Sequence, residues 1–275
     1  MTSNEDCLKK YKDYLLVKYP GHYKRFCKRE NTEPEATMAE AVIFSLFRSQ
    51  DFDIIISEDL NIGGADFLCE KNNSSFLLEV TAIKAETVER QSGLKDKISE
   101  ESSVFSYSTI TNTLLSKAKN KNNQLRNAKI PGVLAITTDH SAGDELLGIR
   151  AAQRLLTGDT KIGVAVNSNH RTVNNLTDLK NSIFFNKELK PCRESISALL
   201  LVHILPNQCS MIGILNPSPV MEFPIKHLPS VPFARVVHCP LKNNKIETEW
   251  VLKSPAPAQL NYQPIDFKDE ELRNH

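Results

Sequence analysis

The order of expected elements places this chain in the α/β class, with a central mixed β-sheet flanked by helices. Apolar strands follow one another between residues 52 and 83, which predicts hairpin pairing there. A helical stretch at 107–128 then separates them from a further apolar strand at 132–139. Consecutive strands pair antiparallel, whereas a helical crossover brings strands together in parallel, so one sheet is expected to contain both kinds of pairing.

The composition is that of an ordinary globular protein. The chain has 275 residues, of which 40% are hydrophobic and 24% charged, and its net charge of +1 excludes no class of partner. The longest apolar stretch, at 197–205, is too short to cross a bilayer, so no membrane partner is expected. The first thirty residues lack the layout of a signal peptide, and the six cysteines show no zinc-binding spacing. We therefore expect reduced thiols and a cytoplasmic protein.

Three segments are expected within a single domain. Residues 1–34 alternate basic with aromatic and aliphatic side chains, which predicts two short helices. Residues 35–167 are expected to form the core, and residues 168–275 a C-terminal elaboration packed on it. No internal repeat or low-complexity tract divides the chain further.

The elements of the core follow from apolar periodicity and turn residues. Pro34 suits the first turn of a helix, which is expected to end near Gln50. The expected order after it is strands at 52–59, 63–71 and 75–83, a polar stretch at 84–106, a helix at 107–128, a strand at 132–139, a helix at 143–157, a strand at 161–167, a polar segment at 168–190, a hairpin of 196–205 with 208–216, and an irregular proline-rich tail from Pro217.

Three isolated carboxylates stand in apolar surroundings. Glu40 is the only charged residue of 36–47, Asp66 lies in "GGADFLCEK", and Glu79 lies in "FLLEVTAIK". Each has an ordinary explanation of its own, since Glu40 fits a solvent-facing strip, Asp66 a turn and Glu79 an edge strand facing water. Together, on a helix and two neighbouring strands, they are better explained by a shared Mg²⁺ or Mn²⁺ ion, because hard cations take carboxylate oxygens as ligands.

These motifs carry a resemblance to a known group of enzymes. Glu40 on a helix, followed by "GGAD" and then "LLEVT", resembles the PD-(D/E)XK nuclease superfamily over about residues 35–140. The resemblance implies a restriction-endonuclease-like sandwich and a metal site. By that resemblance Asp66 and Glu79 are metal ligands, the carbonyl of Val80 completes the set, and Glu40 acts directly or through a water.

Thr81 departs from the superfamily's pattern, which normally has a lysine two residues after the second acid. Alternation places Thr81 on the same face of the strand as Glu79, yet a hydroxyl carries no fixed positive charge to stabilise a phosphate. Either an ammonium group comes from elsewhere in the chain, or the protein is not an active nuclease.

The helix expected at 107–128 offers a replacement. At about 100° per residue, Lys121 falls in the middle of the apolar face, which is formed by Ile110, Leu114, Ala118 and Leu125. The resemblance allows the lysine to move to this following helix, with a glutamine beside it, so Lys121 and Gln124 are expected in the catalytic site with Thr81. The alternative is a lysine that extends along apolar surface to reach water. Lys84 is a weaker candidate, because it points away from Glu79 in a continuous strand.

A basic surface follows from the same helix. Residues 117–129 contain five basic residues and no acid, which is typical of a surface that contacts phosphates, although an ordinary solvated helix face has the same composition. The residues expected to bind nucleic acid are Lys84, Lys117, Lys119, Arg126 and Lys129.

The sequence thus predicts a Mg²⁺-dependent phosphodiesterase, foremost a DNA endonuclease of bacterial defence, restriction or repair type, with DNA favoured over RNA. One alternative is a degenerate member of the same fold that binds nucleic acid or protein without cutting. A second is an unrelated α/β protein with structural acids. A second copy of the chain, or a partner ATPase or helicase, stays open as a further partner.

Overall fold

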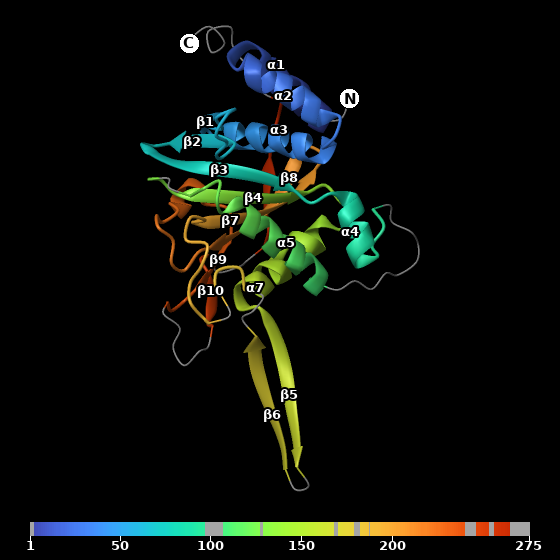
Figure 1. Ribbon diagram of the computed structural model, residues 1–275, viewed down its shortest axis with the longest axis vertical. Helices are drawn as coiled ribbons and strands as arrows, with labels where there is room; N and C mark the ends of the chain where they lie inside the picture. The colour runs from blue at the N-terminus through green and yellow to red at the C-terminus, as the bar shows by residue number, and fades with distance from the viewer. Residues whose placement is uncertain are drawn as a thin grey trace.

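The computed structural model describes residues 3–96, 107–126, 129–167, 170–178, 182–186, 188–239, 246–252 and 256–264. Within this part of the chain a nine-stranded sheet lies between two helical layers (Figure 1). The coarse prediction of an α/β protein with a mixed central sheet flanked by helices is therefore confirmed.

The helices begin close to where the sequence predicts them. Pro20 and Pro34 each stand at the first turn of a helix, where the missing N–H of proline costs no hydrogen bond. The helices are α1 (Ser3–Lys18), α2 (Pro20–Glu30), α3 (Pro34–Ser49), α4 (Ala85–Ser92), α5 (Tyr107–Lys121), α6 (Gly143–Leu147) and α7 (Ile149–Thr157), with a 3-10 turn at Ile225–His227. None of the helices in the described ranges is long and apolar enough to span a bilayer.

The strands form one large sheet and one separate hairpin. The large sheet contains β1 (Asp53–Ile56), β2 (Phe67–Lys71), β3 (Ser74–Ala82), β4 (Gly132–Thr138), β7 (Ala198–Leu205), β8 (Gln208–Leu215), β9 (Phe233–Val236), β10 (Thr248–Trp250) and β11 (Ala258–Asn261). The hairpin consists of β5 (Asp159–Asn167) and β6 (His170–Asp178), and it projects away from the sheet (Figure 1).

The connections decide the pairing of each strand. β1, β2 and β3 are joined by short turns and pair antiparallel. β3, β4 and β7 pair in parallel, because α5 and then α6 and α7 lie between them in the sequence. The sheet runs in the order β1-β2-β3-β4-β7-β8-β9-β10, with β11 paired to β8. Residues after 168 thus supply strands to the same sheet as residues 53–138.

The two faces of β3 lead into two different cores. Phe76, Leu78 and Val80 are buried in the core that α1, α2 and α3 cover, whereas Ile83 belongs to the core beneath α5 and α7. Because side chains alternate along a strand, Glu79 shares the α5 face with Ile83. This alternation positions a carboxylate beneath the end of α5.

Four expected elements differ in the structure. The segment expected as polar at 168–190 contains the strand β6, which pairs with β5. The helix predicted at 107–128 ends at Lys121, and the one predicted at 143–157 is divided at Gly148, whose extended backbone separates α6 from α7. A side chain at Gly148 would lie 2.1 Å from the carbonyl oxygen of Asp144, so the glycine permits this break. The prediction of a wholly irregular tail was wrong, because its short segments between prolines pair as β9, β10 and β11.

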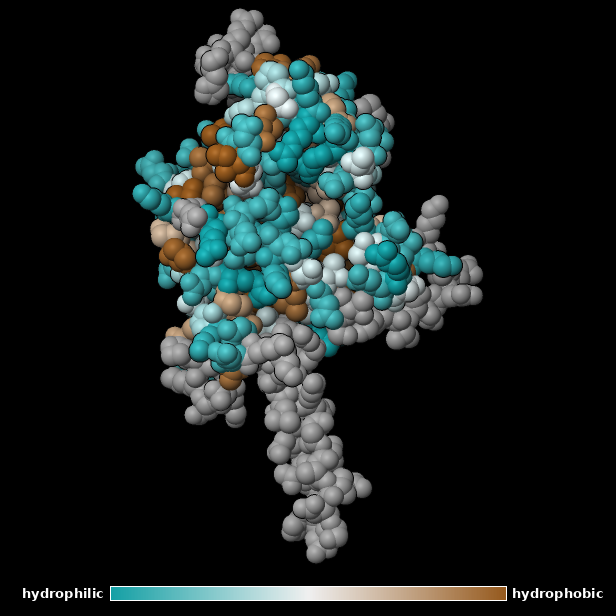
Figure 2. Space-filling model, in the orientation of Figure 1, coloured by the Kyte–Doolittle hydropathy of each residue, from teal (hydrophilic) through white to brown (hydrophobic). Residues whose placement is uncertain are grey.

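One edge of the sheet carries exposed apolar side chains. β1 is an edge strand, and hydrophobic atoms gather over its region and that of α1 (Figure 2). Leu60 packs against the start of α2 at Gly21, beside this edge. The exposed apolar residues of these regions are Leu16 and Val17 on α1, Ile55 on β1, and Leu60 and Ile62 after β1.

Candidate active site

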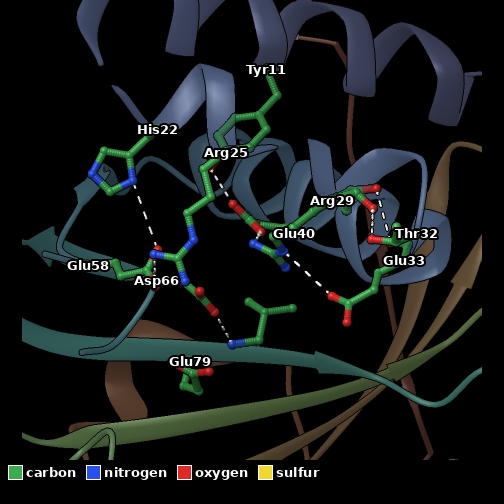
Figure 3. A network of polar contacts seen from close by, with 12 residues as sticks. Tyr11, His22, Arg25, Arg29, Thr32, Glu33, Glu40, Glu58, Asp66 and Glu79 are labelled. Carbon is green, nitrogen blue, oxygen red and sulfur yellow. Dashed lines mark hydrogen bonds and ion pairs between the residues drawn. The ribbon is translucent and has the colours of Figure 1, made fainter. Parts of the chain in front are cut away.

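Glu40 lies in a buried pocket between the three N-terminal helices. Tyr11 of α1 donates its hydroxyl to Glu40 Oε1 at 2.9 Å, and Arg29 of α2 donates Nη1 to Oε2 at 3.0 Å (Figure 3). Glu40 is only 8% exposed, so it does not lie on a solvent-facing strip. Both of its oxygens are taken by protein donors, which leaves Glu40 as a support for the neighbouring acids.

Burial raises the pKa of Glu40 to about 7, and the nearby carboxylate of Asp66 adds to this rise. Arg29 and the hydroxyl of Tyr11 act in the opposite direction, since both favour the charged form. Arg29 and Tyr11 therefore stabilise the charged form of Glu40, whereas burial and Asp66 oppose it.

Replacing Arg29 with alanine is expected to destabilise the fold by about 1–3 kcal/mol, because Glu40 would keep only Tyr11 as a partner. Arg25 on the same helix is a matched control, since its partner Glu58 lies at 3.1 Å and its side chain is 47% exposed. Arg25→Ala should cost less than about 1 kcal/mol. Urea unfolding of both variants measures the difference, and equal losses would contradict this role of Arg29.

Asp66 lies directly before β2, at the end of a turn that contains Gly63 and Gly64. Both glycines have positive φ angles, 82° and 133°, which side chains disfavour. The backbone N–H of Val80 donates to Asp66 Oδ2 at 2.7 Å. Phe67 pairs with Leu78, so the antiparallel register continues to bring Asp66 opposite Glu79.

Burial also raises the pKa of Asp66, to about 6. The Val80 N–H, Lys121 and Arg29 oppose the rise, whereas Glu58 strengthens it. Both helical layers therefore place a cation near Asp66, with Arg29 on α2 and Lys121 on α5.

Glu79 and Lys121 form the closest ion pair of the candidate site. Lys121 Nζ lies 2.6 Å from Glu79 Oε1, and the Glu79 side chain has no exposed surface. Among the described residues, Glu79 Oε2 has no hydrogen-bond partner. Burial and the Asp66 charge raise the pKa of Glu79 to about 8 despite Lys121. The buried carboxylate is therefore only half satisfied by the protein.

Lys121 reaches this position as the last residue of α5. Ile110, Leu114 and Ala118 of the same helix are buried in the core beneath it, as the apolar periodicity predicts. Thr81, which occupies the usual lysine position, is 6% exposed. The ammonium group near Glu79 thus comes from α5, forty-two residues after the carboxylate.

Gln124 lies outside the helix on which the sequence prediction placed it, so that prediction was wrong. α5 ends at Lys121 and residues 122–126 form turns, in keeping with the low helix propensity of the asparagines at 120, 122 and 123. Gln124 Nε2 instead donates to the carbonyl of Gly64 at 3.4 Å. It therefore contacts the turn that carries Asp66 and not a site on the helix face.

The expected basic surface is only partly open to solvent. Lys119, Arg126, Lys129 and Lys84 are exposed, the last directly before α4. Lys117 is partly buried, and burial together with the neighbouring Lys121 lowers its pKa. The exposed members border the end of α5 that reaches Glu79.

α2 contributes residues that the sequence interpretation missed. His22, Arg25 and Arg29 share one face of the helix by their spacing and point toward the acids (Figure 3). Glu58 accepts from Arg25 and lies 3.9 Å from His22 Nδ1. The spacing of the basic residues at 22, 25 and 29 could have predicted that they share one face of a helix. It could not predict the acids that they contact, because those acids lie on other elements.

Asp66 and Glu79 fit a divalent cation by their donor chemistry. No three His, Cys, Asp or Glu side chains within the described ranges converge on one point, so a shared three-carboxylate cage is absent from that part of the chain. Mg²⁺ needs only one or two carboxylates, with waters as its other ligands. The unpartnered Oε2 of Glu79, beside Asp66, is the observation that favours such an ion.

The raised pKa values predict an unusual pH dependence. Glu79 titrates near 8 in the folded protein, against an ordinary value of 4.5, so the folded state holds a proton that the unfolded state releases. Stability of the metal-free protein should therefore fall as the pH rises from about 5 to about 8.5. Thermal unfolding across this range measures the slope, and Glu79→Gln should flatten it. A slope that the substitution leaves unchanged would contradict the assignment.

Comparison with protein-family models, with curated proteins and with solved structures finds no match to this chain. No relative therefore lends it an activity, a substrate or a cofactor. The candidate site is supported by the arrangement of Asp66, Glu79 and Lys121 within this chain.

Proposed function

We propose that this protein is a Mg²⁺-dependent phosphodiesterase that cleaves DNA, with a core of the PD-(D/E)XK type. The single observation that carries the proposal is the ion pair of 2.6 Å between Lys121 and Glu79, in an apolar setting next to Asp66. Two acids and a lysine are the groups that this chemistry uses, and here they come from two adjacent strands and a crossover helix.

The order and pairing of the helices and strands support the same proposal. A helix (α3) precedes three antiparallel strands (β1–β3), and two helices (α4 and α5) connect β3 to the parallel strand β4. This is the order that a restriction-endonuclease-like sandwich requires. Asp66 and Glu79 lie on the neighbouring strands at the centre of that unit, where the superfamily carries its acids.

Asp66 and Glu79 would hold the ion, with the carbonyl of Val80 as a further oxygen ligand. When bound, a divalent cation polarises the scissile phosphate and lowers the pKa of water. Glu40, held by Arg29 and Tyr11, keeps the negative potential at the site without being exposed itself. An ion would also supply the partner that Glu79 Oε2 lacks.

Lys121 provides the positive charge that Thr81 cannot. Glu79 would hold the ion, and the Lys121 ammonium would donate to the attacking water or to a phosphate oxygen, where negative charge develops. The Thr81 hydroxyl, two residues after Glu79, is a neutral hydrogen-bonding group beside it. Gln124 positions the Asp66 turn through Gly64.

The surrounding basic side chains suit a nucleic-acid substrate. Lys84, Lys119, Arg126 and Lys129 are exposed, and Lys117 is partly exposed, around the end of α5. Such residues bind phosphates independently of sequence and make affinity depend on salt. The resemblance to the PD-(D/E)XK superfamily, and not the residues of the site, implies a role in bacterial defence, restriction or repair in the cytoplasm, with a second copy or a partner ATPase or helicase as further components.

Nucleic-acid binding without cleavage is the second candidate. The observation that favours it is the complete burial of Glu79 beneath Lys121, since an internal ion pair neutralises the carboxylate without a metal. In that case the site is structural and the exposed lysines bind the backbone alone.

Incubation of the protein with labelled DNA separates the two candidates. We expect cleavage of DNA in Mg²⁺ or Mn²⁺, none in a chelator, and slower cleavage of RNA of the same sequence. Single-stranded, duplex and circular substrates should be compared in parallel. Binding of DNA with no cleavage in either metal, on all substrates, would favour the second candidate.

A further inference from the structure

A cavity of about 480 Å³ lies next to the candidate active site and has no role in the chemistry described above. It is formed where the turn after α5 meets residues 192–197 and 220–221. This volume is within the range of small-molecule sites in proteins.

The turn after α5 joins this cavity to the acids. Asn122, Leu125 and Arg126 line the cavity, and Asn122 directly follows Lys121. Gln124 of the same turn contacts Gly64, two residues before Asp66. The same turn therefore lines the cavity and contacts the turn that carries Asp66.

Two polar atoms of the lining residues lack hydrogen-bond partners within the described part of the chain. They are Oδ1 of Asn122 and Nε of Arg193, both shielded from water. An unpaired buried polar atom costs about 1–3 kcal/mol. Because these two atoms are shielded from water, they lie within the wall of the cavity, and the exposed polar lining groups are the side chains of Arg126 and Glu194.

The remaining walls are apolar at the base and the rim. Leu125 is buried below the cavity, whereas Val220 and Met221 are 64% and 41% exposed above it. Arg126 and Glu194 are exposed at the opening. The cavity thus combines apolar faces with one amide, two guanidinium groups, one carboxylate, two hydroxyl groups and one thiol.

We propose that this cavity binds one unpaired nucleobase of the strand that the enzyme cuts, with Arg126 on the adjoining phosphate. This proposal rests on the proposed function. It specifies the substrate as single-stranded DNA, or as duplex DNA in which a base is unpaired. A nucleobase has flat apolar faces and an edge with both donors and acceptors, which Asn122 and Glu194 match. A phosphate alone fits Arg126 and Arg193 but leaves the apolar walls and the Glu194 carboxylate without a partner.

Calorimetric titration of the metal-free protein with each of the four deoxynucleoside monophosphates tests this site. We expect binding in the millimolar range, weakened at least about tenfold by Met221→Trp, which fills the cavity, and by Asn122→Ala. Asn123→Ala is the matched control, because Asn123 is exposed and absent from the lining. Ribose 5-phosphate and inorganic phosphate should bind the wild type only weakly. Their affinity should be no higher than that of the nucleotides for the Met221→Trp variant.

Three outcomes would overturn the proposal: no nucleotide binding, binding that Met221→Trp leaves unchanged, or equal binding of ribose 5-phosphate. Met221 is an exposed residue, so the tryptophan variant is expected to fold, and its thermal unfolding checks this. The titration needs neither metal nor cleavage. Failure of the nuclease proposal appears as cleavage that survives Asp66→Asn, whereas failure of the cavity proposal leaves that result untouched.

Discussion

Replacing Lys121 with methionine is expected to slow metal-dependent DNA cleavage by about 10²–10³-fold, the usual loss when one charge-stabilising donor is removed from an active site. Methionine keeps the apolar stem that packs beside Leu114 and Ala118, so the fold should persist. The ammonium that lies 2.6 Å from Glu79 would be lost. Single-turnover cleavage of labelled DNA measures the effect.

Lys119 is the matched control for this substitution. It lies on the same helix two residues earlier, and its side chain is exposed. Lys119→Met should weaken DNA binding slightly and reduce its salt dependence, with the rate of bound substrate within about twofold of the wild type. Equal losses for both variants would mean that Lys121 acts only as part of the basic surface.

A second substitution tests whether an ammonium group at position 81 can replace that of Lys121. Thr81→Lys in the Lys121→Met background returns the ammonium to the usual position, on the face of β3 that Glu79 shares, and into space that the shorter side chain leaves. Recovery of roughly tenfold in rate is expected. No recovery, with both variants folded, would count against a shared role of the two positions.

Glu79→Gln is expected to abolish the stabilisation of the protein by Mn²⁺. An ion at a hundred times its dissociation constant stabilises a folded protein by about 2.7 kcal/mol, and this gain requires the carboxylate. Without metal, the variant should be as stable as the wild type or more stable at pH 8.5, because a buried charge is removed. Thermal unfolding with and without Mn²⁺ measures both effects.

Glu70 provides the control for this experiment. It is an exposed carboxylate on β2, the strand that follows Asp66. Glu70→Gln should leave the Mn²⁺-dependent shift unchanged. A shift that survives in Glu79→Gln but disappears in Glu70→Gln would place the ion elsewhere.

The sequence was informative where local patterns determine the structure. Alternation predicted that Glu79 and Thr81 share a face of β3, and helical periodicity placed Lys121 on the buried face of α5. Both arguments depend only on the geometry of one element. The approach of Lys121 to Glu79 was expected from the resemblance, which allows the lysine to move to this helix, and the structure brings the two groups within 2.6 Å of each other.

Tertiary contacts were beyond such patterns. Tyr11 and Arg29 hold Glu40 from helices 29 and 11 residues away in the sequence, and no periodicity relates those positions. The end of α5 was also missed, since apolar spacing continued to Leu125 while three asparagines favoured a turn. Gln124 was placed on the helix for that reason.

The central claim is that Asp66, Glu79 and Lys121 form a metal-dependent site for cutting nucleic acid. The most direct measurement is the rate of Mg²⁺-dependent DNA cleavage by the wild type and by Asp66→Asn, prepared and assayed together. Cleavage by the wild type that falls by at least about 10²-fold in the variant is the predicted result. Equal rates in the two proteins would contradict the claim.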